Sequence, residues 1–436
     1  MEYINRYGKS EMQYLTSSAK KNLITSLAKQ AIETICKFIL MRQILLAYGS
    51  EMNGLMQSAT KYMQAAIICE FGLEPVITAA LYRPLAKRDQ DEINDVYNAA
   101  HKIYNRIFYV LLGYILILLL VFPKLTKTSY ITADTLLVAI AIGTVFEYWI
   151  GKAEKNILTA DRHIYVISIA SITATVTSVA FGLLLIHFKA SLVSVKLLGS
   201  ICVAASMIYL YRHVRSKYGV RLIKHFSGYQ IKQQWNGIAQ HISYMTINYL
   251  DVPLMTLMCS LTEISVYSVY MLVSLTIRRT VQTVATVFQP ELGNLYAKQE
   301  YIRFKHYYKK LNMICVVSMF FAMISAYFLF PTFIIIYTNG DNVYYNEHFT
   351  FLVCLSCFLQ SCREPIHKVV QVMGLFKETQ NIYWTATVLN IVLSVVGIWY
   401  FGFIGVTFGP IASMLVQNLC LRVKVETEIE RKFDDN

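Results

Sequence analysis

The sequence predicts an all-α integral membrane protein with twelve transmembrane helices in two six-helix halves. Of its 436 residues, 56% are hydrophobic and only 15% are charged, which is too apolar for a soluble domain of this length. Twelve apolar windows reach the length of about 20 residues that a helix needs to cross a bilayer. Basic residues gather in alternate connections between these windows, as the positive-inside rule predicts.

The first window begins after a polar N-terminal stretch, and the others follow at short intervals. The expected spans are residues 23–48, 53–80, 104–123, 131–151, 164–187, 190–211, 235–260, 264–292, 311–337, 348–373, 380–400 and 402–421.

The orientation follows from the loops. Connections after even-numbered spans hold most of the Lys and Arg, whereas the opposite loops hold only Lys124, Lys127, Lys189 and Lys196. We therefore expect both termini in the cytoplasm. The same loops account for the net charge of +13, so no nucleic-acid partner is expected.

A weak internal repeat relates the two halves. Glu51–Leu55 opens the second span much as Glu263–Tyr267 opens the eighth, and similar Leu-Tyr pairs end both spans. Six spans per half give both halves the same orientation, with a pseudo-two-fold axis along the membrane normal and a V-shaped central cavity. The predicted domains are an N-terminal half (1–211), a basic cytoplasmic linker (212–232) and a C-terminal half (233–436) with a short cytoplasmic tail.

The first span carries four charged residues. Lys29, Glu33 and Lys37 are spaced four apart, so they share one helix face and can pair, and Arg42 follows. Charges at this depth usually face a protein interior or a water-filled path. The first span therefore predicts a polar cavity.

Arg278 and Arg279 lie near the middle of the eighth span. Adjacent helical residues point about 100° apart, so one can face the cavity while the other pairs with a neighbour. Both anion binding and a structural ion pair remain open for these arginines.

Three carboxylates are candidates for a coupling ion or for charge pairing. Asp251 precedes Pro253, which should bend the seventh span, and Glu70 lies where Gly72 and Pro75 should break the second. Glu33 is the third. For Glu70 the simpler interpretation is a partner for Lys37 or Lys61. Near the end of the fourth span, Glu147, Lys152 and Lys155 are expected to pair or to snorkel at the inner surface.

Cationic residues outnumber carboxylates in the expected cavity, which implies an anionic substrate. Guanidinium groups suit phosphate and pyrophosphate particularly well. The predicted substrate-binding residues are Lys37, Arg42, Arg278, Arg279, Arg363 and Lys29.

Several segments carry a resemblance to a known family: AYGSEMNGL, EFGLEPVITAALYRPLAKRD, NILTADRHIYV and the stretch from Arg363 to Gly409. The chain resembles Wzx-type polysaccharide flippases of the multidrug/oligosaccharidyl-lipid/polysaccharide exporter superfamily. The resemblance implies alternating access of two halves, which carry an undecaprenyl-pyrophosphate-linked oligosaccharide to the outer leaflet. Its polyprenyl tail would stay in the lipid bilayer.

We expect no cofactor and no metal. The resemblance implies a bacterial plasma membrane, with an Na⁺ or H⁺ gradient as the candidate driving force and polysaccharide polymerase machinery as a candidate partner. One alternative is a cation-coupled small-molecule exporter of the same fold. Another is a polysaccharide polymerase or glycosyltransferase, which the short outer loops disfavour.

Overall fold

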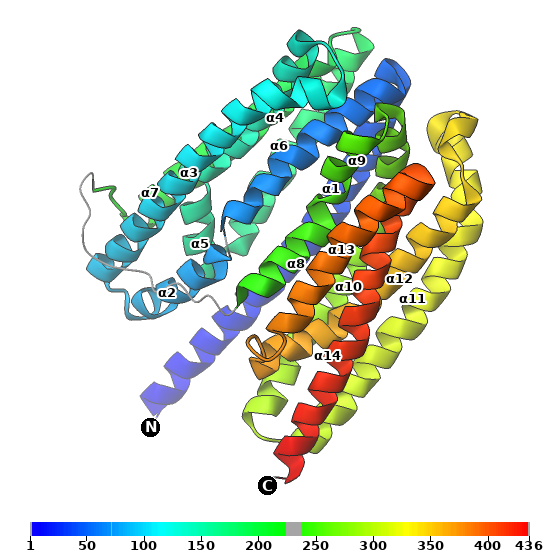
Figure 1. The fold of residues 1–436 in the computed structure, drawn as a ribbon. Coiled ribbons are helices and arrows are strands. Elements are labelled where there is room, and N and C mark those ends of the chain that lie inside the picture. Colours follow the sequence, from blue (N-terminus) through cyan, green and yellow to red (C-terminus); the bar gives the residue numbers. More distant parts are fainter. Residues whose placement is uncertain (1, 71, 224–236, 435–436) are drawn as a thin grey trace. The chain divides into compact units, whose positions relative to one another are not determined.

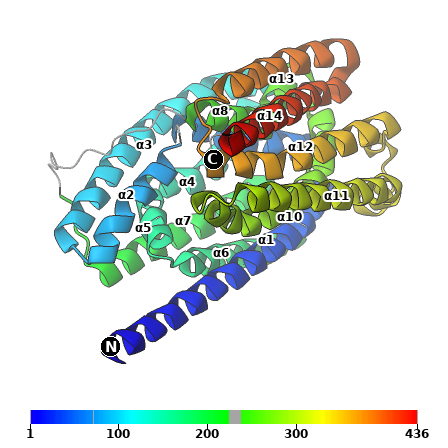
Figure 2. The same cartoon turned by 90° about the horizontal axis from the view of Figure 1, so that it is seen from below.

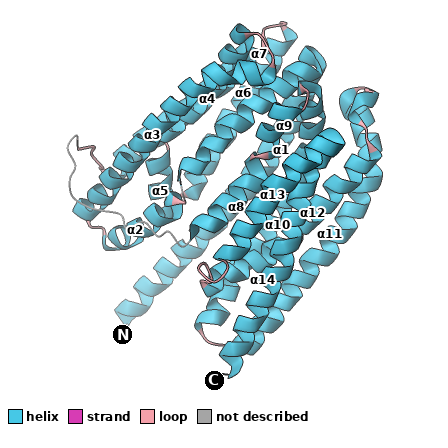
Figure 3. Ribbon diagram, viewed as in Figure 1, coloured by secondary structure: helices cyan, strands magenta, loops and turns pink. Residues whose placement is uncertain are grey.

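The computed structural model describes residues 2–70, 72–223 and 237–434, and these residues form helices and connecting loops without any strand (Figures 1 and 3). The chain divides into two compact units. The first comprises Met1–Ala47 and Cys69–Gln234, and the second comprises Tyr48–Ile68 and Trp235–Asn436.

The first unit is a bundle of long apolar helices with two shorter ones. Within it, α4 packs against α3 and α7, α6 packs against α7, and the short α2 lies on α5. Its elements are the N-terminal part of α1 (Glu2–Ala65), then α2 (Leu73–Lys87), α3 (Gln90–Thr126), α4 (Tyr130–Ile150), α5 (Lys152–Ala160), α6 (Ile164–His187) and α7 (Leu192–Tyr218).

The second unit contains the remaining helices. In it α12 packs against α10, α11 and α14, and α13 packs against α14 and α8; the pairs α11–α12 and α13–α14 run side by side in two views (Figures 1 and 2). The helices are α8 (Ile238–Tyr249), α9 (Asp251–Met258), α10 (Leu261–Ala297), α11 (Tyr301–Thr338), α12 (Glu347–Met373), α13 (Gln380–Phe401) and α14 (Phe408–Asp434).

Side-chain caps mark the starts of four helices. Asp89, Ser191 and Asn346 each accept a hydrogen bond from the backbone N–H three residues later, at the starts of α3, α7 and α12. Ser260 and Glu263 form a reciprocal capping box at the start of α10. Such caps satisfy backbone donors that the first helical turn leaves unpaired.

The junction between the first two predicted spans is a kink in α1. Gly49, with a left-handed φ of 79°, separates the two helical parts of this element. Beyond this point the chain packs within the second unit, where Asn53 Nδ2 donates to Ser265 Oγ (2.6 Å) and Tyr344 donates to Ser50 (2.8 Å). Residues 48–68 thus belong to the second compact unit, although they lie within the predicted N-terminal half. The division at residue 211 stays a prediction.

The predicted linker is partly helical. Residues 212–218 continue α7, which ends at Tyr218 and is followed by Gly219 in the left-handed conformation. Residues 224–232 lie outside the described residues. The linker between the two halves stays a prediction.

The predicted break in the second span is confirmed. The short 3₁₀ segment Ala66–Glu70 ends before Gly72, whose φ of 72° is left-handed, and α2 begins at Leu73. The helices on either side differ in direction by 50°. A glycine adopts this backbone conformation without the steric penalty of a Cβ atom.

Six helices among the described residues are long and apolar enough to cross a membrane alone, and the bent pair around residue 71 would add a seventh. Of the other predicted spans, the seventh is divided into the two short helices α8 and α9, and the eighth and tenth carry more charge. α10 holds Arg278 and Arg279, and α12 holds Arg363, Glu364 and Lys368. These are the spans in which charged residues concentrate.

Candidate functional site

The predicted bend in the seventh span is confirmed at Leu250, where α8 ends and α9 begins. Pro253 has no N–H, so it cannot donate to the carbonyl of Tyr249 in the preceding turn. The interruption brings Asn248 and Asp251 to the edge of a pocket in the second unit.

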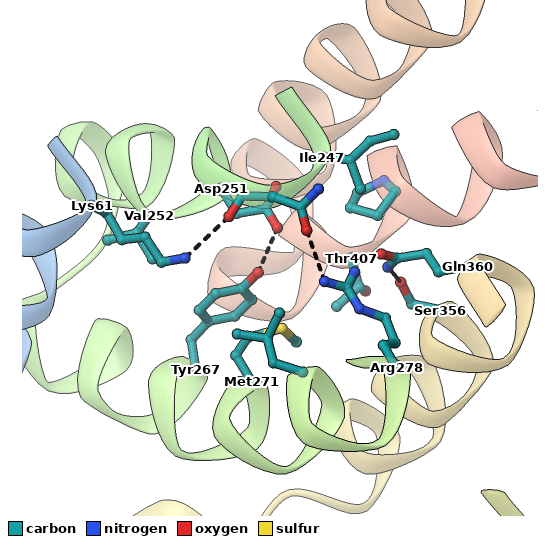
Figure 4. Close-up of a pocket in the computed structure, with 13 residues that line it drawn as sticks. Lys61, Ile247, Asp251, Val252, Tyr267, Met271, Arg278, Ser356, Gln360 and Thr407 are labelled. Carbon is teal, nitrogen blue, oxygen red and sulfur yellow. Dashed lines mark hydrogen bonds between the residues drawn. The ribbon is translucent and has the colours of Figure 1, made fainter. Parts of the chain in front are cut away.

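The pocket lies between α8, α9, α10 and α12 and the part of α1 that belongs to this unit (Figure 4). Its empty space is about 460 Å³ when the open solvent at its mouth is included. Its charged lining residues are Lys61, Asp251 and Arg278, and amides come from Asn248 and Gln360.

Asn248 positions both cations. Its main-chain carbonyl accepts a hydrogen bond from Lys61 Nζ (3.0 Å), and its side-chain Oδ1 accepts one from Arg278 (2.8 Å). The two cations therefore line one pocket although they come from distant parts of the chain (Figure 4). Among the described residues, only one of the five N–H donors of Arg278 has a partner.

Asp251 is buried, with 8% of its surface exposed. Tyr267 donates to its Oδ2 (2.5 Å), whereas its Oδ1 has no hydrogen-bond partner among the described residues. An unpaired buried carboxylate oxygen is costly, so Oδ1 is a ready acceptor for a ligand proton or a cation.

Two cations and one carboxylate leave the pocket with a formal charge of +1. The available donors of Arg278 suit a phosphate oxygen, because a guanidinium can donate two parallel hydrogen bonds. The arrangement favours a small anionic group, with Asp251 beside it.

The sequence singled out two members of this pocket, Arg278 and Asp251, and the structure brings them together. Arg279 is exposed and does not line the pocket. The sequence analysis did not predict Lys61 or Asn248 as site residues. Lys61 is a charge inside a predicted span, which is the same signal that identified Arg278.

Arg363 lies elsewhere in the second unit. It is buried, and its guanidinium donates to Glu364 Oε1 (2.9 Å) and to Gln417 Oε1 (3.1 Å). These contacts favour a structural ion pair, while substrate binding by Arg363 stays a prediction.

The cations of the first span lie on α1 in the first unit. Lys29 and Glu33 are 3.8 Å apart, as their spacing predicted. Lys37 is exposed and Arg42 is half-buried. Their roles in substrate binding, and that of Glu33 in coupling, stay predictions.

Glu70 belongs to a charge cluster in the first unit. It is buried, accepts a hydrogen bond from Tyr148 (2.5 Å) and lies 2.7 Å from Lys152 Nζ. Lys155 pairs with Glu147 at 2.6 Å. The pairing expected near the end of the fourth span is thus confirmed, but the partners of Glu70 are not the lysines that the sequence suggested.

Lys152 is the central residue of this cluster, because its Nζ also lies 3.7 Å from Glu74 Oε2 and 3.9 Å from Glu147 Oε1. It thereby links α2, beyond the helix break, to the end of α4. The coupling role predicted for Glu70 would require this ion pair to open.

Solved structures with this fold are transporters. The chain matches the inward-facing structure of a multidrug resistance MATE family transporter of the MOP superfamily with a TM-score of 0.67, at 10% identity over 94% of this chain and 99% of that one. It matches the lipid II flippase MurJ, in an inward closed conformation, with a TM-score of 0.69 at 14% identity over 92% and 87%. The chain has their fold.

A third match, the MATE multidrug transporter DinF-BH, has a TM-score of 0.61 at 16% identity and covers 95% of each chain. No protein-family model and no curated protein matches the sequence. The predicted all-α membrane fold class is thereby confirmed. Membership of the exporter superfamily stays a prediction. The Wzx type stays a prediction.

We expect Lys152→Met to destabilise this multi-pass membrane fold by about 3–5 kcal/mol, because it leaves the buried carboxylate of Glu70 without its cation. The measurement is the melting temperature of the purified protein in detergent. Adding Glu70→Gln should restore part of the loss, since it removes the unpaired charge. Unchanged melting of Lys152→Met would show that the pair contributes no stability.

Proposed function

We propose that this protein is a flippase that moves undecaprenyl-pyrophosphate-linked oligosaccharides from the inner to the outer leaflet of a bacterial plasma membrane by alternating access. The observation that carries the proposal is the cationic pocket of the second unit, where Lys61 and Arg278 converge on Asn248. An anionic headgroup cannot cross hydrocarbon unaided. A basic, hydrated site gives it a path while the apolar tail stays in lipid.

In this proposal the pyrophosphate binds at Arg278 and Lys61, and Lys37 and Arg42 of the first unit remain candidates for substrate binding. Asp251 is the proposed site for an Na⁺ or H⁺ that drives the cycle, because its Oδ1 has no hydrogen-bond partner among the described residues. The likeness to the lipid II flippase supports lipid-linked cargo. Both termini would face the cytoplasm. Polysaccharide polymerase machinery would be a partner on the outer face, where the glycan emerges.

The second candidate is a cation-coupled exporter of small molecules. The likeness to MATE multidrug transporters favours it equally, and the buried carboxylate of Asp251 would suit a cationic compound. The excess of cations in the pocket favours the flippase. Because the solved structures that share the fold are transporters and flippases, a polymerase or glycosyltransferase has less support.

The experiment that tests the proposal is depletion of this protein in its host, followed by assay of lipid-linked oligosaccharide on each face of the plasma membrane. An impermeant lectin or glycosidase reports the outer face. We expect complete repeat units to accumulate on the inner leaflet. Units that reach the outer face but remain unpolymerised would support the enzyme, and unchanged pools would support the small-molecule exporter.

A further inference from the structure

A polar face runs along α12, starting at the pocket. Ser356, Gln360, Glu364, His367 and Gln371 follow one another at intervals of three or four residues. At about 100° per residue they fall within an arc of about 80°. In a membrane-spanning helix such a face turns toward protein or water, because polar groups are costly in hydrocarbon.

α10 carries a matching set of residues. Gln282 and Gln289 follow Arg278 by one and three turns, and so lie on the helix face that lines the pocket. α10 packs against α12, and Gln289 Nε2 donates to Gln371 Oε1 at 3.4 Å. The two polar faces therefore meet beyond the pocket as well as at it.

We call Gln282, Gln289, Gln360, His367 and Gln371 the amide track. All five side chains are half-buried, in contrast to the buried ion pair of Arg363. Three of them, Gln289, Gln371 and His367, contact one another. Gln371 Nε2 lies 3.1 Å from His367 Nε2, and His367 Nδ1 lies 2.8 Å from the Tyr383 hydroxyl. Because an amide nitrogen only donates, Nε2 of His367 accepts and Nδ1 carries the proton.

The chemistry of the amide track differs from that of the pocket. Its members are uncharged in this arrangement, and each of its four amides carries both donors and an acceptor. The ring nitrogens of His367 are already engaged by Gln371 and Tyr383. Sugar hydroxyl groups need this combination, whereas phosphate needs donors and positive charge. From Gln360, which lines the pocket, to Gln371 the helix rises about 16 Å. The amide track therefore extends well beyond the pocket, which suits only a small group.

We infer that the amide track binds the glycan of the lipid-linked substrate while the pocket holds its phosphate. The inference rests on the proposed flippase function and adds to it the residues that select the sugar portion. The glycan would then lie along α10 and α12, with the phosphate at Arg278 at one end.

The test uses the full-length protein in lipid nanodiscs with two probes, undecaprenyl pyrophosphate and the undecaprenyl-pyrophosphate-linked oligosaccharide of the host. The variant is Gln289→Leu with Gln371→Leu. This variant removes both partners of their mutual hydrogen bond, which limits the loss of stability. Because His367 Nε2 also loses its donor, the melting temperature of the variant in detergent is measured alongside binding. We expect binding of the glycan-bearing lipid to weaken about tenfold and binding of the glycan-free lipid to stay the same.

Gln380→Leu, at the exposed start of α13, is the matched control and should change neither affinity. Equal weakening of both lipids by the double variant would overturn the inference, since a merely structural role affects both alike. Equal affinity of the wild-type protein for the two lipids would also overturn it and leave the flippase proposal standing. Binding of neither lipid by the wild-type protein would contradict the proposed function itself.

Discussion

Replacing Arg278 by glutamine is expected to abolish surface polysaccharide without lowering the amount of protein in the membrane. The guanidinium lines the pocket and donates only one hydrogen bond within the described part of the chain, to Asn248. Its other donors are thus available to a phosphate. Each charge-assisted hydrogen bond contributes about 1.5–3 kcal/mol, so losing a bidentate contact should weaken headgroup binding at least about a hundredfold.

The measurements are surface polysaccharide by immunoblot and binding of undecaprenyl pyrophosphate to the purified protein. Arg279→Gln is the comparison variant, because it removes the same charge from the next residue, which is exposed and outside the pocket. We expect it to cause a much smaller loss. Normal polysaccharide in the Arg278 variant would remove the anion site from the pocket.

Gly405→Ala is expected to prevent most of the protein from reaching a stable folded state. Gly405 lies in the 3₁₀ segment Gly402–Thr407 between α13 and α14. A Cβ atom there would lie 1.9 Å from the carbonyl oxygen of Gly397, which is backbone and cannot rotate away. Overpacking of this kind costs about 3 kcal/mol or more, and close helix packing in membranes depends on such small residues.

The readouts are the amount of protein in the membrane and its melting temperature in detergent. Gly293→Ala in α10 is the matched control, because nothing lies within 4 Å of the added methyl group. Alanine also favours a helix over glycine by about 1 kcal/mol, so this variant should be at least as stable as the wild-type protein. If Gly405→Ala behaves like the control, the close approach of α13 and the 3₁₀ segment does not limit stability.

The helices follow directly from the sequence. Each of the twelve predicted windows overlaps a helix among the described residues, because an apolar run of this length has to satisfy its backbone hydrogen bonds internally. The breaks near Gly72 and at Leu250 were predicted for the same reason, since glycine and proline act on the backbone locally. Helix ends were less predictable. α3 begins at Gln90, well before the apolar window, because Asp89 caps a polar extension of the same helix.

The candidate site was predicted only in part. Arg278 and Asp251 stood out because each is a charge inside an apolar span. The sequence around each residue is enough to identify it. Lys61 carries the same signal, but its relation to Asn248 does not appear in the sequence. The two residues are 187 positions apart and meet only because residues 48–68 pack within the second unit.

What the sequence determined by itself is therefore the membrane class, the number of apolar spans and which charges lie within them. These properties depend on local composition and on the cost of placing polar groups in hydrocarbon. Only the tertiary structure decided which cations share a pocket, that Glu70 pairs with Lys152, and that Arg363 pairs with Glu364. Such pairings depend on helix packing and on the rotation of each helix about its axis, which side chains distant in the sequence determine together.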